Sequence, residues 1–240
     1  MTKYFVDEIT DDEAVITGLD ARHIATTRGL GVGDKVTVCA YGMDYTCTIT
    51  SVTPQEVRLS VESSAICVAE PNVSLTLYQA NPKAEKLVEI IQKSVELGAS
   101  KIVPFLSERC VSRPNVADFD RKLFRLQKIA KSAAKQSGRG IVPEVSRLHT
   151  LEEVCAEIQL MDHVLFLYEG GGRRFSEISF QGMQDIALIV GSEGGFSPRE
   201  AEQILEIASV TPVWMGERIL RCETAPLAAI SIIMERTGNL

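Results

Sequence analysis

The loop Gly191-Ser192-Glu193-Gly194-Gly195 combines residue types that favour close contact with a ligand. It follows the apolar run IALIV, typical of a buried strand, and precedes Ser197-Pro198-Arg199-Glu200, which has the pattern of a capping box at a helix N-terminus. Such a loop usually binds phosphate, because backbone N–H groups and the helix dipole attract an anion. Here the carboxylate of Glu193 stands at the centre, and the spacing matches neither common phosphate-loop motif. The loop therefore predicts a ligand without phosphate, or a tight turn that only needs its glycines.

A second polar turn, residues 215–225, follows the apolar segment VTPVWM and leads into another apolar helix, PLAAISIIMER. Open α/β sheets bind ligands at the carboxyl ends of their strands, so two such loops indicate one site at one edge of a sheet. Arg221 and Glu223 are the charged candidates in this turn, although either could serve only as an ion-pair partner. Thr224 could cap the following helix.

The chain that must position these loops consists of two regions with different patterns of apolar residues, and the boundary lies near Glu70-Pro71-Asn72. Residues 1–70 carry short alternating apolar runs without a helical period, which predict a small β-barrel. Residues 73–240 alternate apolar strands with helical stretches, which predicts an α/β domain with a mainly parallel sheet. The predicted strands of that sheet are VSLTLYQ, KIVPFLS, HVLFLY, IALIV and VTPVWM.

One predicted helix, residues 118–137, separates apolar from basic side chains. Its apolar stripe, at spacings of three and four, consists of Phe119, Leu123, Leu126, Ala130 and Ala133. Its basic face consists of Arg121, Arg125, Lys128 and Lys135. The segment 101–147 holds eleven Lys or Arg against four acids, so it carries +7 in a chain whose net charge is −7. This distribution indicates either a site for a polyanion or a solvated helix face.

Six cysteines stand singly along the chain, without the spacing of a zinc site or of a disulfide framework. The N-terminal stretch MTKYFVDEITDDE lacks the basic and apolar regions of a signal peptide, and the longest apolar run, APLAAISIIM, is too short to span a membrane. We therefore expect a soluble cytoplasmic protein with reduced thiols, no metal and no membrane partner.

The segments VGSEGGFSPRE and GERILRCETAPLAAI together resemble the signature of the 16S ribosomal RNA uridine-N3 methyltransferases, the RsmE family of SPOUT methyltransferases. QANPKAEKLVEIIQKSVELGASKIVPFLSER and KQSGR are similar to two further motifs of that family. Its N-terminal barrel is matched at His23, Arg28, Gly33 and Asp34. The resemblance covers nearly the whole chain. The sequence departs from the family's usual residues at Thr26, Thr27, Ser132, Lys135 and Ser192.

The resemblance implies a PUA-like β-barrel over residues 1–70 and a SPOUT α/β domain over residues 73–240, whose C-terminal chain forms a trefoil knot. It also implies S-adenosylmethionine as the cofactor, 16S ribosomal RNA or the small ribosomal subunit as the partner, and a homodimer. A sulfonium cation in place of phosphate would explain why Glu193 is acceptable in the loop. The apolar side chains of the C-terminal helix could form the dimer interface or the core; they are Leu227, Ile230, Ile233 and Met234.

The resemblance implies three groups of site residues. Arg221 is expected to stabilise negative charge on the uracil, and Glu223, or else Glu193, to accept the N3 proton. The expected cofactor contacts are Leu167, Gly191, Glu193, Gly194, Gly195, Met215, Ile219, Leu220 and Thr224. The expected RNA contacts are Arg28, Arg109, Arg113, Arg121, Arg125, Lys128, Lys135, Gln136 and Arg139. For Leu167 and Met215, ordinary core packing is the alternative.

Two other functions are compatible with these patterns. A SPOUT enzyme of the same fold could methylate another RNA position or a ribose 2′-hydroxyl. A non-catalytic RNA-binding protein of ribosome assembly would need the basic helix and would use the glycine loops only as turns. The presence of both loop motifs favours an enzyme over the non-catalytic protein.

Overall fold

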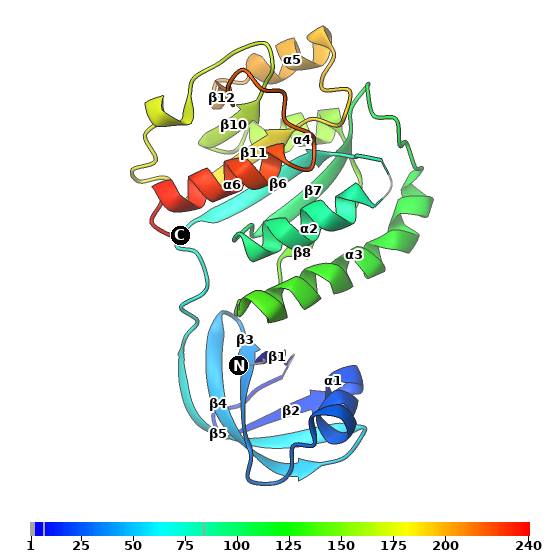
Figure 1. Cartoon of the computed structure of the whole chain (residues 1–240), viewed down its shortest axis with the longest axis vertical. Coiled ribbons are helices and arrows are strands. Elements are labelled where there is room, and N and C mark those ends of the chain that lie inside the picture. Colours follow the sequence, from blue (N-terminus) through cyan, green and yellow to red (C-terminus); the bar gives the residue numbers. More distant parts are fainter. Residues whose placement is uncertain (1–2, 7, 84) are drawn as a thin grey trace. The chain divides into compact units, whose positions relative to one another are not determined.

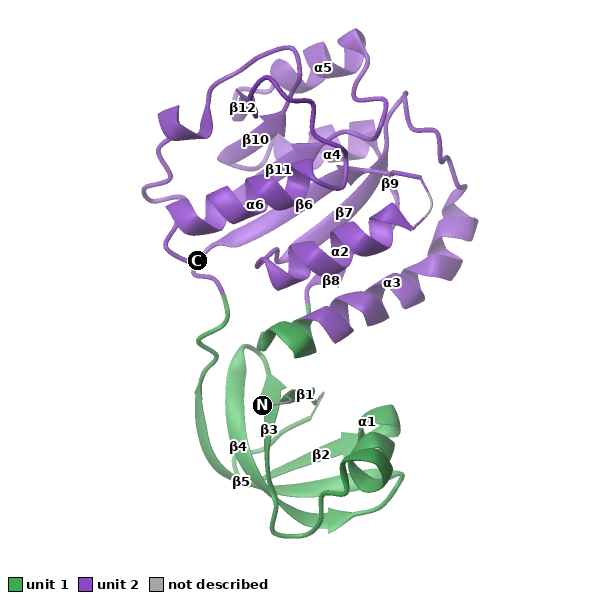
Figure 2. Cartoon of the chain, viewed as in Figure 1, with its two compact units in different colours: residues 1–70, 134–142 green, residues 71–133, 143–240 purple. Residues whose placement is uncertain are grey.

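The computed structural model describes residues 3–6, 8–83 and 85–240. The chain divides into two compact units (Figure 2): residues 1–70 with 134–142, and residues 71–133 with 143–240. The break after residue 70 falls beside the boundary predicted at Glu70-Pro71-Asn72. The segment 134–142, which ends a long helix and begins the loop after it, belongs to the first unit, and no local pattern in the sequence indicates this.

The first unit is built on a curled five-stranded sheet, which forms a half-barrel (Figure 1). Its strand order is β1 (Lys3–Phe5), β3 (Lys35–Ala40), β4 (Met43–Val52), β5 (Glu56–Ile66) and β2 (Glu13–Thr17). β1 pairs with β3 in parallel, and all other pairs are antiparallel. Two register shifts between β4 and β5 bend the sheet around a core that includes the fully buried Val38 and Ile49. The alternating runs thus predict β2, β3, β4 and β5 correctly, whereas the three-residue strand β1 is additional.

The first unit also contains a helix where the alternating runs predict none. α1 (Gly18–His23) continues into a π-helical turn, η1 (Ile24–Arg28). Ala21 and Ile24 are its buried residues, and they pack into the core of the sheet. The expectation of no helix is therefore wrong. Two buried positions in one short helix are too few to produce a recognisable helical period.

The second unit is built on a seven-stranded sheet in which every pair is parallel. Its strand order is β12 (Val210–Val213), β10 (His163–Leu167), β11 (Asp185–Val190), β6 (Ser74–Ala80), β7 (Lys101–Leu106) and β8 (Glu144–Val145), with β9 (His149–Thr150) also paired to β7. All five strands predicted from the sequence are present. β8 and β9 are additional, because strands of two residues carry no periodic pattern.

Helices cover both faces of this sheet (Figure 1). α2 (Lys86–Glu96) and α6 (Ala225–Arg236) pack together on one face, whereas α4 (Leu151–Ile158) and α5 (Pro198–Leu205) share a core with the other face. α2 ends at Glu96, and Gly98 adopts a φ of +107° just after its C-cap, Leu97, a conformation that suits glycine. The fifth helix, α3 (Val116–Ser137), buries the predicted stripe, in which only Leu123 is half-buried.

The C-terminal helix α6 contributes to the core of its own chain. Ile230, Ile233 and Met234 are at most 1% exposed, and Leu227 is half-buried. Of the two interpretations of these side chains, the structure therefore supports core packing. Within the described part of the chain, no helix is long and apolar enough to cross a membrane. The trefoil knot stays a prediction.

Candidate functional site

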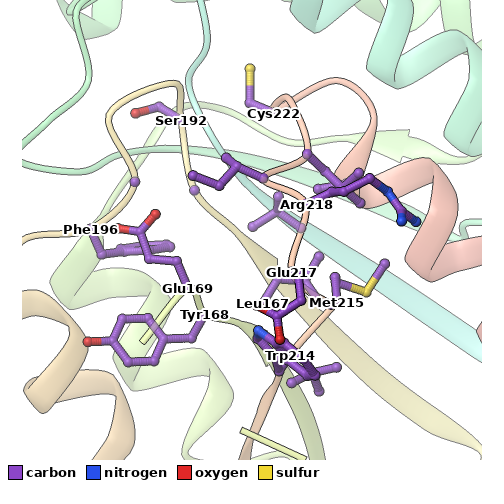
Figure 3. Close-up of a pocket in the computed structure, with 18 residues that line it drawn as sticks. Leu167, Tyr168, Glu169, Ser192, Phe196, Trp214, Met215, Glu217, Arg218 and Cys222 are labelled. Carbon is purple, nitrogen blue, oxygen red and sulfur yellow. The ribbon is translucent and has the colours of Figure 1, made fainter. Parts of the chain in front are cut away.

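The carboxyl ends of the neighbouring strands β10, β11 and β12 open into a cavity of about 470 Å³ (Figure 3). Because these strands are parallel and adjacent, the loops that follow them meet at one edge of the sheet. The cavity is lined by Leu167, Tyr168, Glu169, Val190, Gly191, Ser192, Gly195, Phe196, Val213, Trp214, Met215, Gly216, Glu217, Arg218, Ile219, Leu220, Cys222 and Ala225. The two motif loops thus form one site, together with the residues at the end of β10.

The structure brings most of the predicted cofactor contacts into this lining. Those that line the cavity are Leu167, Gly191, Gly195, Met215, Ile219 and Leu220. Those outside the lining are Glu193, Gly194 and Thr224. Thr224 occupies the N-cap position of α6, as the alternative interpretation expects, but its side chain makes no capping hydrogen bond. The predicted catalytic residues Arg221 and Glu223 also lie outside the lining, on either side of Cys222, which belongs to it.

The conformation of the 191–195 loop requires glycine. Gly195 has a φ of +63°, and its N–H donates to the carbonyl of Ser192 at 3.0 Å, which closes a tight turn. A Cβ on Gly194 would lie 2.9 Å from the Cβ of Arg109, and one on Gly195 would lie 3.3 Å from the Glu169 carboxylate. The loop is therefore both a tight turn and one wall of the cavity.

The helix after this loop begins as the sequence predicts. Ser197 Oγ accepts a hydrogen bond from the Glu200 N–H at 3.3 Å, and Glu200 Oε2 accepts one from the Ser197 N–H at 2.9 Å. Glu200 is only 6% exposed, and its Oε1 accepts a further bond from the Glu108 N–H at 2.6 Å. This buried carboxylate joins α5 to the loop after β7, so the cavity wall is fixed from two elements that are distant in sequence.

A lysine from α2 links the two motif loops. Lys86 Nζ lies 3.2 Å from Glu193 Oε1 and 2.9 Å from Glu223 Oε2. Glu193 Oε1 also accepts a hydrogen bond from the backbone N–H of Lys83 at 3.1 Å. Both carboxylates considered as proton acceptors are therefore ion-pair partners in the structure. The sequence motif includes Lys86, but no local signal places its ammonium between the loops.

The charges of this cluster reinforce one another. The hydrogen bond from Lys86 lowers the pKa of Glu223. Burial acts to raise the pKa of Glu193, but its own backbone N–H, that of Lys83 and the Lys86 ammonium outweigh burial and lower it. The carboxylates, Glu223 above all, raise the pKa of Lys86. All three groups are therefore charged at neutral pH, and a carboxylate with a lowered pKa is a weak proton acceptor.

Cys222 is a residue of the cavity lining. Burial, together with the hydrogen bond that Sγ donates to Glu223 Oε2 at 3.2 Å, raises the pKa of Cys222 to about 12. The thiol is neutral at physiological pH and is a poor nucleophile. All six cysteines are buried, and none of them forms a disulfide. In the described ranges, no group of three His, Cys, Asp or Glu side chains is arranged to hold a metal.

Lining residues absent from the sequence prediction include the charged Glu169, Glu217 and Arg218 and the aromatic Phe196 and Trp214. Figure 3 shows Glu169, Phe196, Trp214, Glu217 and Arg218 among the side chains that line the cavity. A signal was available for two of them, because Glu169 directly follows HVLFLY and Trp214 stands at the end of VTPVWM, the positions where parallel sheets bind ligands. The two carboxylates make the cavity suitable for a ligand with a positive charge.

Some of the predicted RNA contacts project into solvent. Arg121 and Arg125 side chains are 79% and 65% exposed, and their ion pairs with Asp118 and Glu85, both 3.0 Å, are solvated and therefore weak. Lys128, from the same face of α3, is also exposed. Three further predicted contacts are exposed: Arg28, Arg109 and Gln136.

The remaining predicted RNA contacts are engaged within their own units. Arg139 is only 3% exposed and pairs with Glu70 at 2.8 Å. Lys135 pairs with Asp20 at 2.5 Å, and Arg113 donates to two backbone carbonyls of its own loop. We therefore assign Arg139 to the stability of the first unit, because its buried guanidinium offers no surface to a phosphate.

Comparisons with known proteins agree with this site. The family model of the RNA methyltransferase domain matches residues 69–234, which include the whole cavity. The chain is 32% identical to the ribosomal RNA small subunit methyltransferase E of Bacillus subtilis over 100% of this chain and 98% of that protein. The crystal structure of a ribosomal RNA small subunit methyltransferase E from Neisseria gonorrhoeae bound to S-adenosyl methionine is similar, with a TM-score of 0.85 and 27% identity over 98% of this chain and 97% of that one.

The parallel sheet and the cavity at its edge are thus those of an RNA methyltransferase domain. Within this class, the chain belongs to the ribosomal RNA small subunit methyltransferase E family. The resemblance inferred from the two loop motifs and the mixed α/β fold class are therefore confirmed.

Proposed function

We propose that the chain transfers the methyl group of S-adenosylmethionine to N3 of a uridine in 16S ribosomal RNA. The observation that carries this proposal is the cavity at the ends of β10, β11 and β12, which unites both motif loops. A similar structure of the same family is bound to S-adenosyl methionine, and its relatives are named as methyltransferases of small-subunit ribosomal RNA.

The lining of the cavity fits this cofactor. Glu169 and Glu217 present carboxylates, which favour a cationic ligand and disfavour phosphate. Met215 and Leu220 offer apolar surface to an adenine ring, and Gly195 permits a close approach to the nucleoside. When bound, S-adenosylmethionine supplies an electrophilic methyl group on its sulfonium sulfur.

The protein's own residues must orient the uracil and take up its negative charge. The N3–H group of uracil is a weak acid, so the transfer requires in-line positioning and stabilisation of charge as the N3–C bond forms and the C–S bond breaks. We assign Arg221, which is exposed beside the cavity, to the uracil carbonyl oxygens. Glu223 then has a positioning role, because its ion pair with Lys86 holds the turn that carries Arg221. The N3 proton of the uracil passes to water.

The exposed face of α3 is the proposed phosphate-binding surface, through Arg121, Arg125 and Lys128. Phosphate contacts position an RNA without reading its sequence, so selection of the uridine requires other contacts, for which we propose the PUA-like first unit with Arg28. The resemblance further supports a knotted C-terminal chain and a cytoplasmic homodimer without a membrane partner.

Two measurements test the proposal. Calorimetric titration of the purified protein with S-adenosylmethionine should show binding, and its absence would contradict an enzyme. Mass spectrometry of nucleosides from small ribosomal subunits incubated with protein and cofactor should then show N3-methyluridine. A 2′-O-methyl nucleoside in its place would identify a different target. RNA binding without cofactor binding would identify a non-catalytic assembly protein.

A further inference from the structure

An aromatic side chain stands among the cations on the outer face of α3. Phe124 is 71% exposed. It lies three residues after Arg121 and four before Lys128, so these side chains share one face of the helix with Arg125. The buried side of α3, which includes Phe119 and Leu126, faces the opposite way.

Packing of the fold does not account for this ring. Phe119, five residues earlier on α3, is 2% exposed, and burial of its ring stabilises the fold. Phe124 makes no such contribution, because its ring is exposed. The Phe124 ring contacts a cation, because Lys128 Nζ lies 4.3 Å from the ring centroid. The ring therefore belongs to the charged surface and not to a core.

A ring surrounded by cations has the chemistry of a surface that binds single-stranded RNA. Unpaired bases stack on aromatic side chains, while Lys and Arg follow the phosphates, and stacking works for any base. Pairing of this face with the same face of a second copy is disfavoured, because two such basic faces repel each other.

We propose that Phe124 is a stacking platform for an unpaired base of the RNA substrate, with Arg121, Arg125 and Lys128 binding the phosphates on either side. The inference rests on the proposed function, since it takes RNA as the partner. It adds to that function a preference for a single-stranded segment next to the target.

The test compares full-length Phe124→Leu and Phe124→Tyr with the unmodified protein. Leucine keeps an apolar side chain but cannot stack, whereas tyrosine keeps the aromatic face. A single-stranded oligoribonucleotide labelled with 2-aminopurine is titrated with each protein, and the same strand in a duplex serves as the second probe. We expect Phe124→Leu to bind the single strand roughly 5- to 100-fold more weakly, and Phe124→Tyr to bind it normally. The logarithmic salt slope should be unchanged in both variants, because neither alters a charge.

Leu160 provides the matched control, because it is an apolar residue that is 88% exposed and belongs to the turn after α4 and not to the basic face of α3. Leu160→Ala should bind both probes like the unmodified protein.

Equal affinity of Phe124→Leu and the unmodified protein for the single strand would overturn the inference, and so would an equal loss of affinity for the duplex. Loss of self-association by Phe124→Leu with intact RNA binding would show that the ring serves a protein interface. Calorimetry with S-adenosylmethionine separates the two proposals, because Phe124→Leu should retain cofactor binding, whereas failure of the unmodified protein to bind it would contradict the function alone.

Discussion

Lys86 Nζ and Glu223 Oε2 lie 2.9 Å apart, and this ion pair joins α2 to the turn that carries Arg221. The same ammonium lies 3.2 Å from Glu193 Oε1 in the glycine loop. One side chain therefore sets the spacing between the two loops that form most of the cavity. The methyltransferase site depends in this way on a residue that does not itself line the cavity.

Replacement of this lysine should weaken cofactor binding. Lys86→Met removes both ion pairs and leaves two carboxylates that repel each other, so we expect the Kd for S-adenosylmethionine to rise roughly fivefold by calorimetry. Lys86→Arg should retain most of the affinity. The control is Lys93→Met, which breaks an exposed ion pair with Glu89 on the same helix and should have no effect. Equal affinity of Lys86→Met and the unmodified protein would show that the loops are positioned without the lysine.

The same cluster should produce a pH dependence of thermal stability. The pKa values of Glu193 and Glu223 are lowered below 4.5, so their stabilising contribution is complete above that pH and is lost as the pH falls through the lowered values. The pKa of Lys86 is raised above 10.5, so its contribution is complete below that pH and is lost as the pH rises through the raised value. The Tm of Lys86→Met should therefore fall less at acid pH and at alkaline pH than the Tm of the unmodified protein does. Thermal denaturation over a range of pH measures both. Parallel curves for the two proteins would contradict the coupling.

Arg221 should affect turnover more than binding. We expect Arg221→Ala to lower the rate of methyl transfer roughly 100-fold or more, because it removes a group that stabilises charge mainly in the transition state. The Kd for S-adenosylmethionine should stay close to that of the unmodified protein in calorimetry. Arg199→Ala, an exposed residue of α5, is the control for loss of a surface charge. Parallel losses of turnover and cofactor affinity would assign Arg221 a structural role.

Charge reversal on α3 should identify the phosphate-binding surface. The triple variant Arg121→Glu, Arg125→Glu and Lys128→Glu should bind RNA more weakly and with a shallower dependence on salt, by about 0.7 in the logarithmic slope for each lost contact to a single strand. A filter-binding series at several salt concentrations measures this slope. An unchanged slope would place the RNA elsewhere on the protein.

Arg139 should matter for stability and not for RNA affinity. Arg139→Ala leaves Glu70 without its charged partner in a largely buried position, so we expect a loss of about 3 kcal/mol in the free energy of unfolding. Arg121→Ala, on the exposed face of α3, should change it by less than about 0.5 kcal/mol. Chemical denaturation measures both. A loss of RNA affinity by the folded Arg139→Ala protein would contradict the assignment.

The local patterns of the sequence determined the elements and the edge of the sheet where the site lies. The five apolar runs became the main parallel strands, and Ser197 and Glu200 formed the predicted capping box. The brief elements escaped prediction: α1 with its π-helical turn, and the two-residue strands β8 and β9. A hydrophobic period must repeat several times along the sequence before it can be recognised, so short helices and strands cannot be predicted from it.

Only the tertiary structure decided which polar groups meet. Hydrophobic periodicity reports the face on which a residue lies, and it contains no information about the partner that a long charged side chain reaches across the fold. For that reason Lys86 could be matched to a motif but not placed between Glu193 and Glu223, and Arg139 was indistinguishable from the exposed arginines of α3 until its pair with Glu70 was known. The sequence by itself determined the family and the two loops; the spacing of those loops, and the division of the basic residues into exposed and buried, depend on contacts between distant parts of the chain.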